Sequence, residues 1–140
     1  MDYYLILASA LVVLLVIFLV ALWSARKLRS RRIQVQERTE TKFREIRQLL
    51  AIDTEAAQRM AVIEADKLLD FILKSKGIKG KTLGERLKRS TRLIPNLNQV
   101  WFAHKVRNRL VHELESKTSR KEADQIVKIF QAAIKQLVKF

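Results

Sequence analysis

The residues best suited to chemistry lie in one run, from His104 to Glu113. Histidine takes or gives a proton near neutral pH, arginine offers a fork of donors to phosphate oxygens, and asparagine orients a histidine nitrogen or a substrate oxygen. Arg107, Asn108 and His112 therefore suit metal-free cleavage of RNA. A base would take the proton of a 2′-hydroxyl, and Arg107 would stabilise the negative charge on phosphorus.

The run fits a third helix of the body, from about Asn98 to Leu114. At about 100° per residue, an apolar stripe that ends at Leu114 faces the core. His104, Arg107, Asn108, Val111, His112 and Glu115 fall on the adjacent arc. One histidine supplies a base or an acid rather than both, so a two-fold dimer would bring in the missing partner.

A simpler interpretation places the same side chains on a solvated helix face, with Arg107 or Arg109 paired to Glu113 or Glu115. A metal site is not predicted, because His104 and His112 are two turns apart and no third ligand is evident. The absence of cysteine excludes thiolate metal sites and cysteine nucleophiles. No cofactor is expected, since the run 76–81 lacks the spacing of a phosphate-binding loop.

A cationic cluster precedes this helix. Five of its residues are predicted to contact nucleic acid, in a basic loop and in the short helix that Thr82 opens: Lys79, Lys81, Arg86, Arg89 and Arg92. The net charge of the 140-residue chain is +14, and every Lys and Arg lies at or beyond Arg26. Such a body attracts polyanions, and charge alone does not separate RNA from anionic lipid.

Residues 3–23 contain no charged side chain. As a helix they would span about 31 Å, which matches the hydrocarbon thickness of a bilayer. Aromatic rings stand at both ends, and basic residues follow at once, which by the positive-inside rule puts the N-terminus outside and the body in the cytoplasm. Residues 1–23 are predicted to be a single-pass anchor in the plasma (inner) membrane. A cleaved signal peptide is disfavoured, because its basic residues precede a shorter apolar stretch.

The remaining chain has the composition of an all-α protein, with few Gly and one Pro. Residues 24–52 are predicted to be a basic juxtamembrane helix or linker. Asp53 would then cap the first of four helices, and Gly77 would end it in a left-handed conformation with Ile78 placed to touch Leu73. Ser119 opens the last helix with a capping box. Residues 53–140 are thus predicted to form an antiparallel four-helix bundle, and a dimer would enlarge its small core.

The stretch from Arg107 to His112, RNRLVH, resembles the Arg-polar-x-x-x-His motif of HEPN domains. These are small helical bundles, many of which are ribonucleases. The resemblance implies a four-helix body over residues 54–140, a face-to-face dimer, catalytic roles for Arg107 and His112, and a supporting role for Asn108. Leu114 departs from the family form Arg-Asn-x-Leu-Val-His-x-Tyr, so regulation through that tyrosine is not expected.

The sequence therefore predicts a membrane-anchored HEPN-like bundle that acts as a metal-independent endoribonuclease in defence or stress. The first alternative is a non-catalytic module that binds RNA or a protein partner at the membrane. The second is a small membrane protein whose bundle only oligomerises. The bilayer, RNA, a second copy of the chain and an unidentified protein are the expected partners.

Overall fold

A computed structural model describes residues 2–113 and 116–138, and within these ranges every regular element is a helix. The predicted all-α class is confirmed. The helices are α1 (Asp2–Ala51), α2 (Glu55–Ser75), α3 (Leu83–Lys88), α4 (Leu97–His112) and α5 (Arg120–Val138). The predicted place of Leu114 at the end of the third helix and of Glu115 beside it lies outside the described residues.

The chain forms two compact units, residues 1–36 and residues 37–140, and α1 contributes to both. In the first unit every residue from Tyr3 to Trp23 is exposed, although the stretch is almost wholly apolar. α1 is long and apolar enough to cross a membrane. An exposed apolar helix of this kind is consistent with a single membrane span.

The second unit begins earlier than the predicted boundary at Asp53, because the last part of α1 belongs to it. Phe43 and Ile46 are buried there. Lys42 forms an ion pair with Glu64 of α2 at 3.5 Å, and the guanidinium of Arg38 lies 4.3 Å from the centre of the Phe71 ring. Residues 37–51 are therefore a helix of the bundle rather than a linker to it.

Charged side chains support this junction between α1 and α2. A hydrogen bond from Lys67 holds the pKa of the Glu64 carboxyl below its ordinary value. The hydrogen bond that Lys42 makes to Glu45 raises the pKa of the Lys42 ammonium. The Lys42–Glu64 pair therefore stays charged at neutral pH, and it marks the side of α2 that faces α1.

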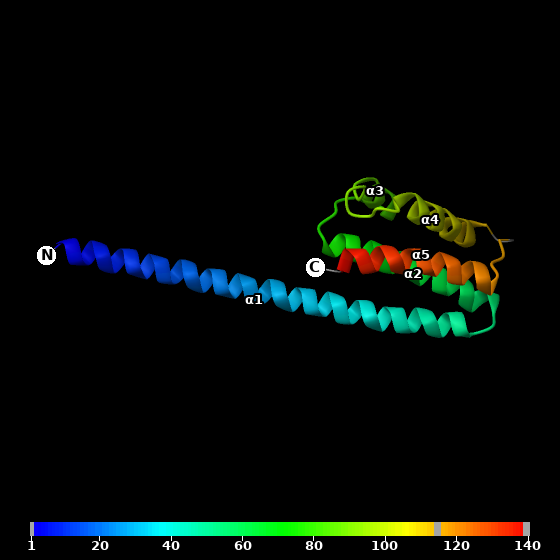
Figure 1. The fold of residues 1–140 in the computed structure, drawn as a ribbon, viewed down its shortest axis with the longest axis horizontal. Helices are drawn as coiled ribbons and strands as arrows, with labels where there is room; N and C mark the ends of the chain where they lie inside the picture. The colour runs from blue at the N-terminus through cyan, green and yellow to red at the C-terminus, as the bar shows by residue number, and fades with distance from the viewer. Residues whose placement is uncertain (1, 114–115, 139–140) are drawn as a thin grey trace. The chain divides into compact units, whose positions relative to one another are not determined.

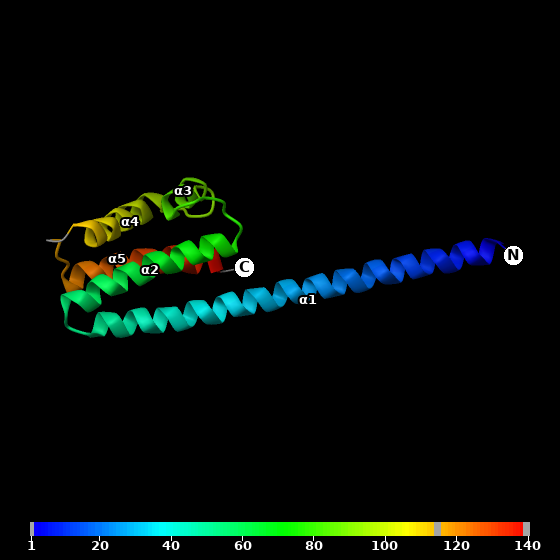
Figure 2. The ribbon, with the colours of Figure 1, turned by 180° about the vertical axis from the view of Figure 1, so that it is seen from behind.

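In the second unit, α2 and α5 lie side by side, with α4 on one side of them and the end of α1 on the other (Figures 1 and 2). Helices that follow one another run antiparallel, apart from the short α3 (Figure 1). The core is made by apolar residues spaced three or four apart, which is the spacing that puts side chains on one helix face. Its largest fully buried members include Leu69, Ile72, Leu110, Phe130 and Ile134.

The start of α2 differs by one residue from the prediction. Thr54, in an extended conformation, is the N-cap, and its hydroxyl accepts a hydrogen bond from the Ala57 amide at 3.3 Å. Asp53 is not the cap. The substitution Thr54→Ala is expected to lower the free energy of unfolding by about 1 kcal/mol, because the first turn loses its acceptor. Asp53→Ala should change it by less than about 0.5 kcal/mol. Urea denaturation of residues 37–140 measures both, and an equal loss in the two variants would contradict the assignment of the cap.

The other end of α2 matches the predicted left-handed ending. Gly77 has a φ of 76°, and the Ile78 amide donates to the Leu73 carbonyl at 3.0 Å. The chain then turns back toward α3, where Gly80 packs closely on Arg86: a Cβ at Gly80 would come within 3.1 Å of the Arg86 backbone nitrogen. This close approach brings the start of α3 beside α2 and α4, where it forms one wall of a cavity.

Candidate functional site

A cavity of about 630 Å³ opens between α2, the start of α3 and α4. This volume lies within the range of small-molecule pockets, roughly 300–1,000 Å³. Its lining carries four Lys or Arg side chains and two carboxylates, so the wall is net cationic. The lining residues are Asp66, Lys67, Asp70, Phe71 and Lys74 of α2, Lys81, Thr82, Leu83 and Gly84 around the start of α3, and His104, Arg107 and Asn108 of α4.

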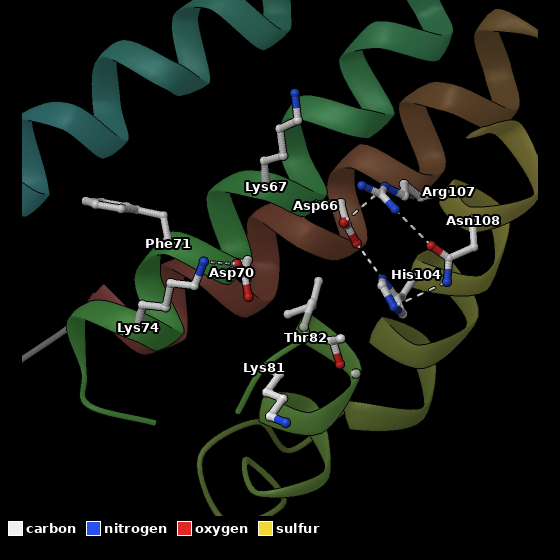
Figure 3. Close-up of a pocket in the computed structure, with 12 residues that line it drawn as sticks. Asp66, Lys67, Asp70, Phe71, Lys74, Lys81, Thr82, His104, Arg107 and Asn108 are labelled. Carbon is white, nitrogen blue, oxygen red and sulfur yellow. Dashed lines mark hydrogen bonds and ion pairs between the residues drawn. The ribbon is translucent and has the colours of Figure 1, made fainter. Parts of the chain in front are cut away.

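Four of the lining residues form a closed network, which we call the polar cluster: Asp66, His104, Arg107 and Asn108 (Figure 3). One carboxylate oxygen of Asp66 lies 2.7 Å from Nδ1 of His104, and the other lies 3.2 Å from Nε of Arg107. Nη1 of Arg107 donates to Oδ1 of Asn108 at 2.9 Å. Nδ2 of Asn108 lies 3.3 Å from Nε2 of His104 and closes the network.

The network favours one tautomer of the neutral His104 ring. The Asp66 carboxylate is an acceptor, so Nδ1 of His104 carries the proton of the neutral ring. Because Arg107 donates to Oδ1 of Asn108, the amide presents its NH₂ group to the imidazole, and Nε2 of His104 is the acceptor. The lone pair on Nε2 is therefore engaged only through the longest contact of the cluster. A substrate hydroxyl that replaced the Asn108 amide there would meet a base oriented by a carboxylate.

Burial makes the cluster electrostatically strong. The side chain of Asp66 is 5% exposed, that of His104 is 13% exposed and that of Arg107 is 23% exposed. Interactions between charges strengthen as water is removed, so Asp66 orients His104 more firmly than an exposed carboxylate would. The Trp101 and His104 rings also pack in a T-shaped arrangement, with ring centres 6.0 Å apart.

Sequence reasoning missed Asp66, although a signal was present. Asp66 follows Val62 by four residues and precedes Leu69 by three, and both of these are fully buried. A carboxylate on such a stripe has to find a buried partner, because an unpaired buried charge is costly. His104 was placed on the correct arc by its spacing but was not assigned to the site.

The predicted catalytic residues are divided between two places. Arg107 and Asn108 both line the cavity and contact each other. His112, the last residue of α4, is exposed and does not line the cavity. His104 and His112 are eight residues apart, or about 12 Å along a helix axis, so the two imidazoles of one chain cannot act on the same phosphate.

The five residues predicted to bind nucleic acid also differ from one another. Lys81 is exposed and lines the cavity, while Lys79 and Arg92 are exposed elsewhere. Arg89 is exposed, and its Nη1 donates to the Lys79 carbonyl at 2.7 Å. Arg86 is only 4% exposed. Its Nη1 donates to the Gly80 and Thr82 carbonyls, and its Nε lies 3.3 Å from Asp70, so it holds the loop before α3 instead of facing solvent.

The substitution Arg86→Gln is therefore expected to lower the free energy of unfolding by about 2 kcal/mol, because two carbonyls lose their donor and Asp70 loses a partner. Lys74 still pairs with Asp70, which limits the loss. Arg92→Gln is the matched control and should stay within about 0.5 kcal/mol of the original chain. Urea denaturation of residues 37–140 compares the two, and equal stabilities would contradict a structural role for Arg86.

Among the described residues, no group of three or more His, Asp or Glu side chains is placed to hold a metal ion. The interpretation in which Arg107 or Arg109 pairs with Glu113 or Glu115 is replaced, within the described residues, by pairs to other helices. Arg107 pairs with Asp66 and Arg109 with Glu122 of α5. Comparison of the chain with protein-family models, with curated proteins and with solved structures found no match in any of the three.

Proposed function

We propose that the protein is a membrane-anchored, HEPN-like endoribonuclease that needs no metal, and that His104 is its general base. The observation that carries the proposal is the Asp66–His104 pair at the wall of a cationic cavity, beside Arg107. This assignment moves the base from His112, which the sequence motif suggested, to a histidine whose orientation is set by a carboxylate.

The reaction follows from the groups in the cavity. Nε2 of His104 would take the proton of a ribose 2′-hydroxyl, and the 2′-oxygen would form a bond to the adjacent phosphorus as the bond from phosphorus to the 5′-oxygen breaks. The departing 5′-oxygen would take a proton from water. Nη2 of Arg107 takes part in neither of the contacts of that side chain with Asp66 and Asn108, so it is the donor available to the phosphate. Lys81 would attract the neighbouring phosphates.

The test is to incubate the full chain, in detergent micelles, with single-stranded and structured RNA in the presence of excess chelator. The proposed reaction leaves fragments with a 2′,3′-cyclic phosphate and a 5′-hydroxyl, and DNA of the same sequence should remain intact because it lacks the 2′-hydroxyl. If RNA also remains intact, or if the fragments carry 5′-phosphates, the proposed reaction does not occur.

The second candidate is a non-catalytic module that binds RNA or a protein partner beneath the membrane. It is favoured by a different property of the polar cluster, in which every member bonds another member, so that the cluster joins α2 to α4. Such a module would bind RNA without turnover. The affinity for RNA is then measured at several salt concentrations. A steep fall of its logarithm with log salt would indicate phosphate contacts, and a flat dependence would indicate that the partner is a protein.

The remaining features complete the proposal. The apolar part of α1 crosses the inner membrane once, and the basic residues after Trp23 keep the bundle in the cytoplasm. A homodimer belongs to the same proposal, because the family resemblance implies one. If activity requires His112 as well as His104, the two would have to come from different copies of the chain.

A further inference from the structure

The first unit contains a second cationic feature, separate from the cavity: five Lys or Arg residues within seven positions. We call it the basic segment, and it consists of Arg26, Lys27, Arg29, Arg31 and Arg32. All of residues 26–32 are helical and exposed. We propose that the basic segment binds anionic phospholipid headgroups and enriches them around the protein. This inference rests on the proposed membrane span.

The basic segment has no acidic neighbour on its own helix to neutralise it. Side chains three or four residues apart on a helix are the ones that form ion pairs, and no Asp or Glu stands at that distance from any of the five cations. The nearest acidic residues along the chain are Asp2 and Glu37. By contrast, the ion pairs of the bundle are supplied by carboxylates from the same or neighbouring helices. The charges of the basic segment are therefore left unpaired along its helix and are available to anions around it.

The distribution of the five cations favours lipid over a single macromolecular partner. At about 100° per residue they surround the helix axis, and the widest gap between neighbours is about 100°. A protein or RNA strand docks on one face of a helix, whereas headgroups surround a membrane helix on every side. Lys27 also lies over the Trp23 ring, 4.7 Å from its centre, at the end of the apolar stretch. Tryptophan is enriched at the membrane–water interface, and lysine there keeps its ammonium among the headgroups.

The length of the basic segment fits the headgroup layer. Residues 26–32 cover about 9 Å along a helix, and the layer on each side of a bilayer is roughly 5–8 Å deep. Lipid phosphates would therefore lie level with most of the five cations. RNA in the aqueous phase would reach only the residues that are farthest from Trp23.

Trp23 provides a reporter beside the basic segment. The full chain carrying Trp101→Phe, which leaves Trp23 as its single tryptophan, is reconstituted in phosphatidylcholine vesicles. Two vesicle preparations are compared, one with brominated phosphatidylcholine and one with the same fraction of brominated phosphatidylglycerol. In both lipids the acyl chains are brominated near the glycerol. Bromine quenches tryptophan on contact, so the two quenching curves give the relative association of the anionic and the zwitterionic lipid. Both leaflets have one composition, so the orientation of the chain does not affect the result.

At a site beside one cation, we expect phosphatidylglycerol to associate about fivefold more strongly than phosphatidylcholine. The preference should fall in the triple variant Arg29→Gln, Arg31→Gln, Arg32→Gln, and the part that remains should come from Arg26 and Lys27, which stays beside Trp23. The matched control replaces Lys105, Arg120 and Lys121, three exposed cations of the bundle, with Gln and should keep the preference. In the unsubstituted segment, 1 M salt should also lower the preference, because it reduces the screening length to about 3 Å.

Equal quenching by the two lipids in the original segment would overturn the inference while leaving the anchor in place. Absence of quenching by either lipid would instead contradict the membrane span itself. A short single-stranded RNA can also be added outside the vesicles. If it abolishes the preference for the anionic lipid in the outer leaflet, the basic segment binds RNA, and the lipid assignment is overturned. Equal losses in the triple variant and in the bundle control would show that only net charge matters, and would overturn it too.

Discussion

The substitution His104→Ala is expected to lower the single-turnover rate of RNA cleavage by about 10²–10⁴-fold, the range that a positioned general base contributes. The reason is the contact at 2.7 Å that orients the imidazole on Asp66 and leaves Nε2 as the acceptor toward the cavity. The measurement follows a labelled RNA strand with enzyme in excess and chelator present, so that substrate release and metal contamination do not affect the rate.

His112→Ala is the matched control, because it removes the same side chain from the same helix at an exposed position outside the cavity. We expect its rate to change less than about twofold if His104 is the base. Far-ultraviolet circular dichroism of both variants checks that the helices are retained. A rate that survives His104→Ala and fails in His112→Ala would return the catalytic role to the residue that the motif suggested.

Asp66→Asn provides a further step in the same argument. The amide has nearly the same shape as the carboxylate, but it has no negative charge to hold the Nδ1 proton or to pair with Nε of Arg107. If Asp66 acts through His104, the variant should lower the rate and also change the pH dependence of the remaining activity. A purely structural carboxylate would lower stability and leave the pH profile of the folded fraction unchanged.

The helices were predictable because local signals agreed with one another. The glycine ending of α2 and the Ser119 start of α5 appear in the structure as their sequences indicated, with hydrogen bonds from Ile78 to Leu73 and from Glu122 to Ser119. Each of these signals is made by residues a few positions apart. The cap of α2 was placed at Asp53 instead of Thr54, because either side chain can fill that role and only the backbone conformation decides between them.

The polar cluster was not predictable in the same way, because it joins residues distant in sequence. Asp66 and His104 are 38 residues apart, and nothing local marks them as partners. Arg86 illustrates the converse. It was predicted to contact nucleic acid with the other basic residues of its cluster, yet its guanidinium donates to the Gly80 and Thr82 carbonyls. The loop conformation buried this one cation and left Arg92 at the surface.

The beginning of the bundle was missed for a related reason. The apolar residues of this segment, Leu28, Val35, Phe43, Ile46 and Leu50, recur at only loosely helical spacing, and the position between Val35 and Phe43 is the polar Thr39. In the structure Thr39 is itself buried, only 2% exposed, and the stripe is continuous. A small hydroxyl side chain tolerates burial when its hydrogen bonds are made, so polarity alone did not mark the edge of the core.

A fragment with residues 37–140 is therefore expected to unfold cooperatively, whereas a fragment with residues 53–140 should lack a cooperative transition. The shorter fragment loses Phe43 and Ile46, which are 3% and 0% exposed in the bundle. Removing an Ile side chain from a core costs about 2–5 kcal/mol, and removing a Phe side chain costs about 3–5 kcal/mol. Together they approach or exceed the net stability of a domain of this size, about 5–15 kcal/mol.

Thermal unfolding followed by circular dichroism compares the two fragments, and the single substitution Ile46→Ala in residues 37–140 isolates the contribution of one contact. That variant should remain folded but melt at a lower temperature, since it removes one buried side chain and keeps α1 in place.

If residues 53–140 melted within a few degrees of residues 37–140, α1 would be dispensable to the bundle. Residues 37–51 would then be a linker, as the sequence predicted, and assays of the isolated bundle could use a fragment that begins at Asp53. If the expected result holds, RNA cleavage by a fragment must be tested from Glu37 onward, because a shorter one would be inactive through loss of structure whatever the role of His104.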